Sequence, residues 1–163
     1  MKVKYISESE IDGEVSNKLL KTASRFIGLI GSYFNINCMA SGTHGKTSAH
    51  YDKPCNALDG YSGKHVDGRN PTKDDMEVVS ENLSKLIAKD DKTVYEESIL
   101  AYLAGFTGIG IYPDWRPKES LHLDVGASLP VRPRPKVWIG KNKEKMQKLI
   151  DKTKGSQIYI YLN

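Results

Sequence analysis

The chain has 163 residues, which is enough for one domain with a hydrophobic core and too few for two domains of ordinary size. Hydrophobic residues make up 39% and charged residues 27% of the chain, as in ordinary globular proteins, and a formal net charge of +4 is too small to identify an anionic partner. Neither a signal peptide nor a membrane span of about 20 apolar residues is recognisable, so we expect a protein made in the cytoplasm that does not contact a membrane.

A long helix is predicted over residues 16–34, because apolar residues recur there at spacings of three and four and form one stripe. The stripe consists of Leu19, Leu20, Ala23, Phe26, Ile27 and Ile30. A short strand over 35–40 leads into the Gly- and Ser-rich loop 41–48. The prolines and glycines of residues 53–70 then favour strand and turn over helix.

Two more helices are predicted in the middle of the chain. One spans 72–89 and has Thr72 as its N-cap candidate. The other spans 95–104 and is ended by Gly105, the residue type that most often closes a helix.

Beyond these helices the pattern favours extended structure. Strands are predicted over 108–112 and 120–125, and the prolines of residues 129–135 exclude a helix there. A short basic helix over 143–152 and an alternating strand over 157–162 close the chain.

These elements predict a single domain over residues 1–163, with a core of about 16–140 and a basic C-terminal extension of about 141–163. The predicted class is α+β, with a small, mostly antiparallel sheet flanked by helices. Cys38 and Cys55 are too few and too far apart for a zinc finger, and we expect two buried thiols. A metal-ligand role for Cys55 is the alternative.

The first candidate site residues lie on the predicted strand 120–125. Successive side chains of a strand point to opposite faces, so His122 and Asp124 share a face while Leu121 and Leu123 point the other way. In such a strand the apolar side chains pack into the core, and the polar pair on the other face is available for catalysis or metal binding. Glu119 precedes the histidine by three residues.

Two more ligand-type side chains, His50 and Asp59, lie upstream. With His122 and Glu119 they complete the set of a catalytic zinc site, in which three protein ligands hold the metal, one position stays open and one carboxylate acts as general base. The sequence thus predicts Zn²⁺ as the cofactor.

One competing pair has the same spacing. His65 and Asp67 repeat the His-x-Asp pattern, but Ser62 stands where Glu119 precedes His122, and Gly63 and Gly68 indicate a surface turn. We therefore expect that His65 is not a metal ligand.

Four segments, in this order, resemble the zinc D-alanyl-D-alanine carboxypeptidase family. They are Ser48-x-His50, Cys55–Asp59, Ala104–Pro113 and Glu119-x-x-His122-x-Asp124. That family includes phage endolysins that cleave L-alanyl-D-glutamate bonds and the structurally related Hedgehog signalling domain, and the match covers about residues 16–140. The resemblance implies a Hedgehog/DD-peptidase-like fold.

Carried over to this sequence, the resemblance makes His50, Asp59 and His122 the zinc ligands. Glu119 takes the place of the catalytic acid and base, and Asp124 that of an acid that orients a ligand.

The sequence departs from the family pattern in two places. The interval between His50 and Asp59 is longer than usual, which leaves Asp52 as an alternative carboxylate ligand. His44 stands where the family has an arginine that holds the substrate carbonyl or oxyanion. A histidine can donate one hydrogen bond there with less permanent charge, so the rate or the substrate class is in question.

The function implied is hydrolysis of peptidoglycan stem peptides by a monomeric enzyme of the cell-wall lytic type, with no nucleic-acid partner. The resemblance leaves open whether it is a carboxypeptidase or an endopeptidase, and whether it is released through a holin pore, carried in a virion or bacterial. Ser48, Tyr112 and Trp115 are the candidate substrate-binding residues, and simple packing is the alternative for the two aromatic ones.

Two other classes of function compete with this hypothesis. A zinc-containing binding or structural module would keep the metal without hydrolysis. A nucleic-acid binder would use the lysines of residues 141–154, but no platform of aromatic and basic residues accompanies them.

Overall fold

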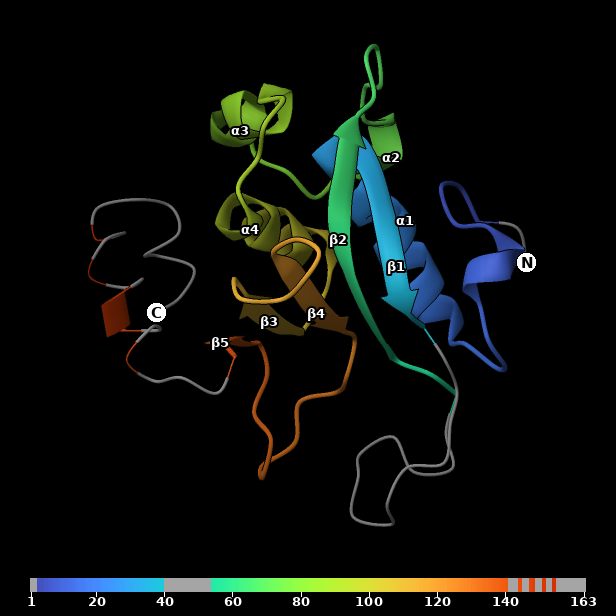
Figure 1. Ribbon diagram of the computed structural model, residues 1–163, viewed down its shortest axis with the longest axis vertical. Helices are drawn as coiled ribbons and strands as arrows, with labels where there is room; N and C mark the ends of the chain where they lie inside the picture. Colours follow the sequence, from blue (N-terminus) through green and yellow to red (C-terminus); the bar gives the residue numbers. More distant parts are fainter. Residues whose placement is uncertain are drawn as a thin grey trace.

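The computed structural model describes residues 3–39 and 54–140, together with Glu144, Gln147, Lys148, Asp151 and Lys154. These residues form an α+β fold with one five-stranded sheet and helices packed against it (Figure 1). The α+β class predicted from the sequence is therefore confirmed. The predicted strand over 157–162 lies outside the described residues.

The sheet has the strand order β1-β2-β4-β3-β5. Its strands are β1 (Ser32–Cys38), β2 (Ala57–His65), β3 (Gly108–Tyr112), β4 (Ser120–Asp124) and β5 (Lys136–Ile139). The pairs β1–β2, β2–β4 and β3–β4 are antiparallel, whereas β5 runs parallel to β3. The sheet is thus mixed, and β5 is a strand that the sequence analysis did not predict.

Helix α1 (Asn17–Ile30) starts at Ser16, whose hydroxyl accepts a hydrogen bond from the Leu19 backbone N–H at 3.1 Å. Its predicted apolar stripe is buried. The prediction that this helix continues to residue 34 was wrong, because Gly31 adopts a left-handed conformation with φ of 67° and turns the chain into β1.

The predicted helix over 72–89 is also wrong, because two short helices, α2 (Lys73–Met76) and α3 (Ser84–Ala88), replace it. Thr72 does cap α2 as predicted, in a reciprocal pair with Asp75. The chain then becomes extended at Ser80, which interrupts the helical pattern.

Helix α4 (Val94–Ala104) begins at Thr93 and ends at Gly105, close to the predicted bounds. It packs against α1, β3 and β4. Apolar side chains of β3 and β4 meet it in the core, and Phe106 makes an edge-to-face contact with Phe26 of α1 at 5.9 Å. The buried strand residues are Ile109, Ile111, Leu121 and Leu123. The polar residues of these strands lie on the opposite face of the sheet, which we call the outer face.

Candidate metal centre

A row of four residues crosses the outer face of the sheet from β2 to β5. Asp59 pairs with His122, His122 with Gly110, and Gly110 with Trp138. Strand register therefore brings together side chains that are far apart in the sequence. The predicted alternation of β4 is confirmed, since Leu121 and Leu123 are buried while the side chain of His122 is 27% exposed.

The imidazole of His122 lies between two carboxylates. Its Nδ1 atom is 2.8 Å from Asp59 Oδ1, and its Nε2 atom is 3.5 Å from Asp124 Oδ2. Burial alone would lower the pKa of His122, but the contacts with Asp124 and Asp59 and their negative charges outweigh it and raise this pKa to about 9. The ring therefore carries a proton on both nitrogens at neutral pH when no other cation lies between the groups.

Asp124 is buried and is held from two further sides. The Gly126 backbone N–H donates to its Oδ1 atom at 2.9 Å, and Arg134 Nη1 lies 3.4 Å from Oδ2. Burial would raise the pKa of Asp124, but the contacts with His122 and Gly126 and the charge of Arg134 lower it. Gly108 makes this arrangement possible, because a β-carbon at that position would collide with both the carboxylate and the guanidinium.

Arg134 is a site residue that the sequence analysis missed. It lies in the segment that joins β4 to β5 and passes the start of β3, where Gly108 pairs with Asp124 on one side and Lys136 on the other. The prolines around it predict extended backbone and give no sign of a partner.

An aromatic cluster lies next to His122. The ring of Trp138 is 5.6 Å from the imidazole, and its Nε1–H donates to the Tyr112 hydroxyl at 3.1 Å. Tyr112 in turn stacks on Trp115 at 3.9 Å. The two aromatic residues predicted to contact substrate are thus connected to the site through Trp138, which the sequence analysis did not single out.

Comparisons of the chain with protein families, curated proteins and solved structures found no match. None of the described helices is long and apolar enough to cross a membrane.

Glu119, the predicted general base, lies directly before β4 and is exposed. Its charge contributes to the raised pKa of Glu97 in α4. Within the described residues, no hydrogen bond or ion pair joins it to Asp59 or His122.

Several predicted residues lie outside the part of the chain that the structure describes. They are His44, Ser48, His50 and the alternative ligand Asp52. Accordingly, the described residues contain no group of three or more metal-ligating side chains. They supply two of the three predicted zinc ligands. Cys55 is buried, as predicted, and its thiol donates to the Ala57 carbonyl at 3.0 Å.

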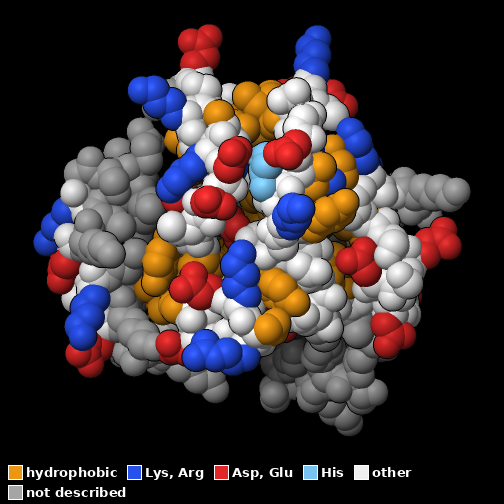
Figure 2. Space-filling model, turned by 45° about the horizontal axis from the view of Figure 1, so that its top comes forward, with side chains coloured by type: hydrophobic (Ala, Val, Ile, Leu, Met, Phe, Trp, Pro, Cys, Tyr) orange, Lys and Arg blue, Asp and Glu red, His pale blue; other side chains and the backbone are white. Residues whose placement is uncertain are grey.

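His65, at the end of β2, has two carboxylate neighbours of its own. Its Nε2 atom lies 3.4 Å from Asp90 and 3.7 Å from Asp67, but both carboxylates are exposed to solvent. Figure 2 shows the molecule with the end that carries α2 and α3 turned forward, and acidic and basic side chains surround a histidine there. Exposed charges of this kind are well solvated, whereas Asp124 beside His122 is buried.

Proposed function

We propose that the protein is a zinc-dependent peptidase that hydrolyses peptidoglycan stem peptides, as a D,D-carboxypeptidase or as an endopeptidase beside a D-residue. Its fold would then be of the Hedgehog/DD-peptidase type. One observation carries the proposal: Asp59 Oδ1 and His122 Nδ1 lie 2.8 Å apart, while a buried carboxylate, Asp124, contacts the other nitrogen of the same ring.

This donor set fits a zinc ion. A neutral imidazole that donates its Nε2–H to Asp124 presents the lone pair of Nδ1 to Asp59. At 2.8 Å the two atoms share a proton in a hydrogen bond, and in the zinc-bound form the metal would take the place of that proton. A histidine ligand whose second nitrogen donates to a carboxylate is the usual arrangement in zinc sites. His50 would supply the third ligand.

Bound zinc would acidify a water molecule and polarise the carbonyl of the scissile bond. Asp59 and His122 would hold the metal, and Asp124 would fix the tautomer and orientation of the His122 ring. The charge of Arg134 adds to the bonds from His122 and Gly126 in lowering the pKa of Asp124. The role of Glu119 as general base stays a prediction that rests on the resemblance.

The outer face determines how a substrate would approach. Helices α1 and α4 pack on the core side, so a peptide reaches His122 only from the outer face. There the rings of Trp138, Tyr112 and Trp115 offer an aromatic surface against which a peptide can pack. We propose that the enzyme acts as a monomer on the bacterial cell wall.

The decisive experiment measures zinc content of the purified protein together with amine release from purified peptidoglycan. We expect stoichiometric zinc and amine release in the wild type, loss of both in His122→Ala, and zinc without release in Glu119→Gln. Mass spectrometry of the products identifies the bond. Absence of zinc from a folded wild-type protein reconstituted with the metal contradicts the proposal.

A second candidate is a zinc-containing binding module without hydrolytic activity. The exposed position of Glu119, with no described contact to His122 or Asp59, favours it. Zinc binding without amine release from several peptidoglycan types would select this candidate.

A further inference from the structure

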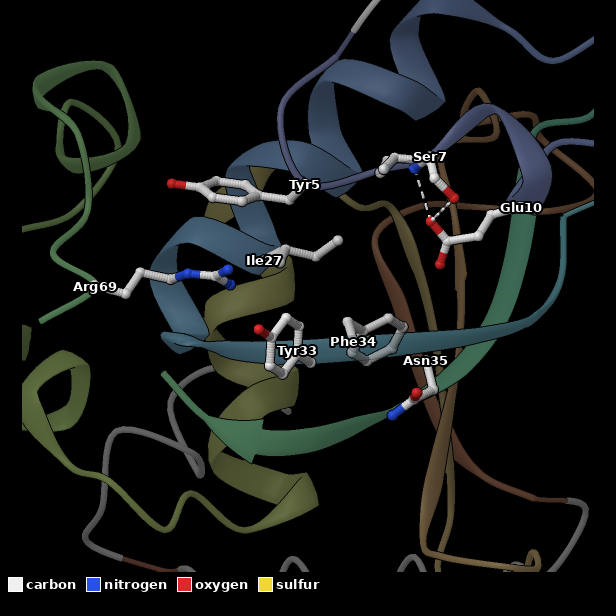
Figure 3. A pocket seen from close by; sticks show the side chains of 9 residues that line it. Tyr5, Ser7, Glu10, Ile27, Tyr33, Phe34, Asn35 and Arg69 are labelled. Atoms are coloured by element: carbon white, nitrogen blue, oxygen red, sulfur yellow. Dashed lines mark hydrogen bonds between the residues drawn. The ribbon is translucent and has the colours of Figure 1, made fainter. Parts of the chain in front are cut away.

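A cavity lies between the N-terminal segment and β1, and neither Asp59 nor His122 lines it. It has a volume of about 410 Å³, which is within the range of small-molecule binding sites. Figure 3 shows its lining: Arg69, Tyr5 and Tyr33 gather at one end, and Ser7, Glu10 and Asn35 at the other. Ile27 and the buried Phe34 lie between them.

Arg69 is held in a fixed position at its end of the cavity. Its Nη1 donates to the Ser32 carbonyl at 2.9 Å, and the guanidinium lies 4.4 Å from the ring centre of Tyr5 and 5.7 Å from that of Tyr33. Among the described residues no carboxylate forms an ion pair with Arg69. A guanidinium carries five N–H donors in a planar fork that matches a carboxylate, so this end of the cavity is prepared for an anion.

Two tyrosine rings shape the end of the cavity at which Arg69 lies. Tyr33 is 60% exposed although it is a large aromatic residue, and Tyr5 has a positive φ of 72°, which is rare for a bulky side chain. Their rings lie on either side of the guanidinium (Figure 3), and both contacts help to hold it in place.

The opposite end of the cavity has the complementary chemistry. Glu10 Oε2 accepts hydrogen bonds from the Ser7 backbone N–H at 2.8 Å and from the Ser7 hydroxyl at 3.0 Å. These bonds fix the carboxylate, and an ionised carboxylate has acceptor sites beyond the two they use. The exposed Asn35 also lines the cavity, and its amide lies over Gly63 of β2. A phosphate bound at Arg69 would leave Glu10 unused, whereas a ligand that also carries a positive charge at this end is attracted by both residues.

We propose that this cavity binds a short peptide with free termini, with its carboxylate on Arg69 and its amino group at Glu10. The apolar floor of Ile27 and Phe34 accommodates the small side chains between these termini. None of these residues belongs to the metal centre, so the site is independent of the proposed hydrolytic function and of zinc.

The experiment is an NMR titration of the ¹⁵N-labelled full chain, in the presence of a metal chelator, with trialanine. Matched probes are trialanine amide, N-acetyl-trialanine and inorganic phosphate. We expect trialanine to shift the backbone amide signals of Tyr33, Phe34 and Asn35 with saturation at millimolar concentration. Amidation and acetylation should each weaken binding by about tenfold or more, because each removes one charge that the cavity recognises.

Protein variants assign each terminus to its partner. Arg69→Gln should bind trialanine and its amide with equal, weakened affinity, and Glu10→Gln should lose the preference for the free amino group. Arg132→Gln, which removes an exposed arginine elsewhere, is the matched control and should bind like the wild type.

Three results would overturn the proposal. They are equal affinity of wild type for trialanine and its amide, signal shifts confined to residues around Trp138, and phosphate binding as tight as that of trialanine. The comparison of modified peptides on the wild type decides the question even where Arg69→Gln is poorly folded.

Discussion

Gly110 of β3 and Trp138 of β5 form a registered pair in which the indole ring occupies the space that a side chain at position 110 would need. A β-carbon on Gly110 would lie 2.7 Å from ring atoms of Trp138. The glycine thus allows the tryptophan to lie over the sheet, next to His122 and within hydrogen-bond distance of Tyr112.

Gly110→Ala should displace the Trp138 ring and destabilise the fold by about 2 kcal/mol, as overpacking does elsewhere. Urea unfolding measures the free energy, and tryptophan fluorescence reports the ring. In a Trp138→Ala background the same substitution should cost much less, so the two changes should be strongly non-additive. Equal costs in both backgrounds would show that the ring does not depend on Gly110.

Arg134→Met should destabilise the protein by about 3 kcal/mol, because it removes one partner of a buried ion pair with Asp124. The pKa of Asp124 should rise, since the charge of Arg134 contributes to its lowering. Under the zinc hypothesis, zinc affinity should also fall by about tenfold, as expected for a group that orients a ligand. Calorimetric zinc titration and denaturant unfolding measure these effects. Arg132→Met, at an exposed neighbouring position, is the control and should change neither quantity.

Glu97 should make the protein less stable as the pH rises from about 4.5 to about 7. Burial raises the pKa of Glu97 to about 7, against the opposing effects of the Ser62 hydroxyl, Lys118 and Lys92. Within this pH window the unfolded chain has lost the proton that the folded protein retains, so the free energy of unfolding falls with pH, by about 3 kcal/mol in total.

Glu97→Gln should remove this pH dependence and be more stable than the wild type at pH 8. The neighbouring Glu96 supplies a control of opposite sign, because bonds with Lys89 and Thr93 outweigh its burial and lower its pKa. Glu96→Gln should therefore lose stability relative to the wild type as the pH rises through the acid range. A pH profile of Glu97→Gln parallel to that of the wild type would contradict the assignment.

Zinc affinity, under the proposed function, should increase with pH by about tenfold per unit between pH 6 and 8. The reason is that His122, with a pKa of about 9, must release a proton before Nδ1 can bind a metal. Calorimetric titration with zinc in buffers of different ionisation enthalpy should measure the number of protons released on binding. Affinity independent of pH would mean that zinc, if bound, does not use His122.

The sequence correctly predicted those helices and strands whose ends depend on residues close by in the chain. Strand β3 has the predicted bounds, and α4 ends at Gly105 as expected, because alternation and a terminal glycine act within a few residues. Helix α1 was predicted too long because the turn at Gly31 depends on one left-handed residue inside an apolar pattern.

The features that the sequence analysis missed depend on distant partners. Strand β5 exists because it pairs in parallel with β3, and its four residues have no distinctive pattern of their own. The contact of Arg134 with Asp124 likewise follows from the path of the chain past Gly108, which no local rule predicts. The candidate metal site was predicted in part because His122 and Asp124 share a strand, while Asp59 was assigned from its chemistry and from the resemblance, and the structure pairs Asp59 with His122.

The 63-residue separation of Asp59 and His122 along the chain has a consequence for how the protein folds. The two side chains meet only when β2 and β4, which are central strands of the sheet, have formed their ladder. A metal ion held by both would join the ends of a long loop and act as a reversible cross-link, which disfavours the open chain. Metal binding by both residues would then show that β2 and β4 have paired. Removal of the metal by a chelator would increase the rate at which these two strands separate.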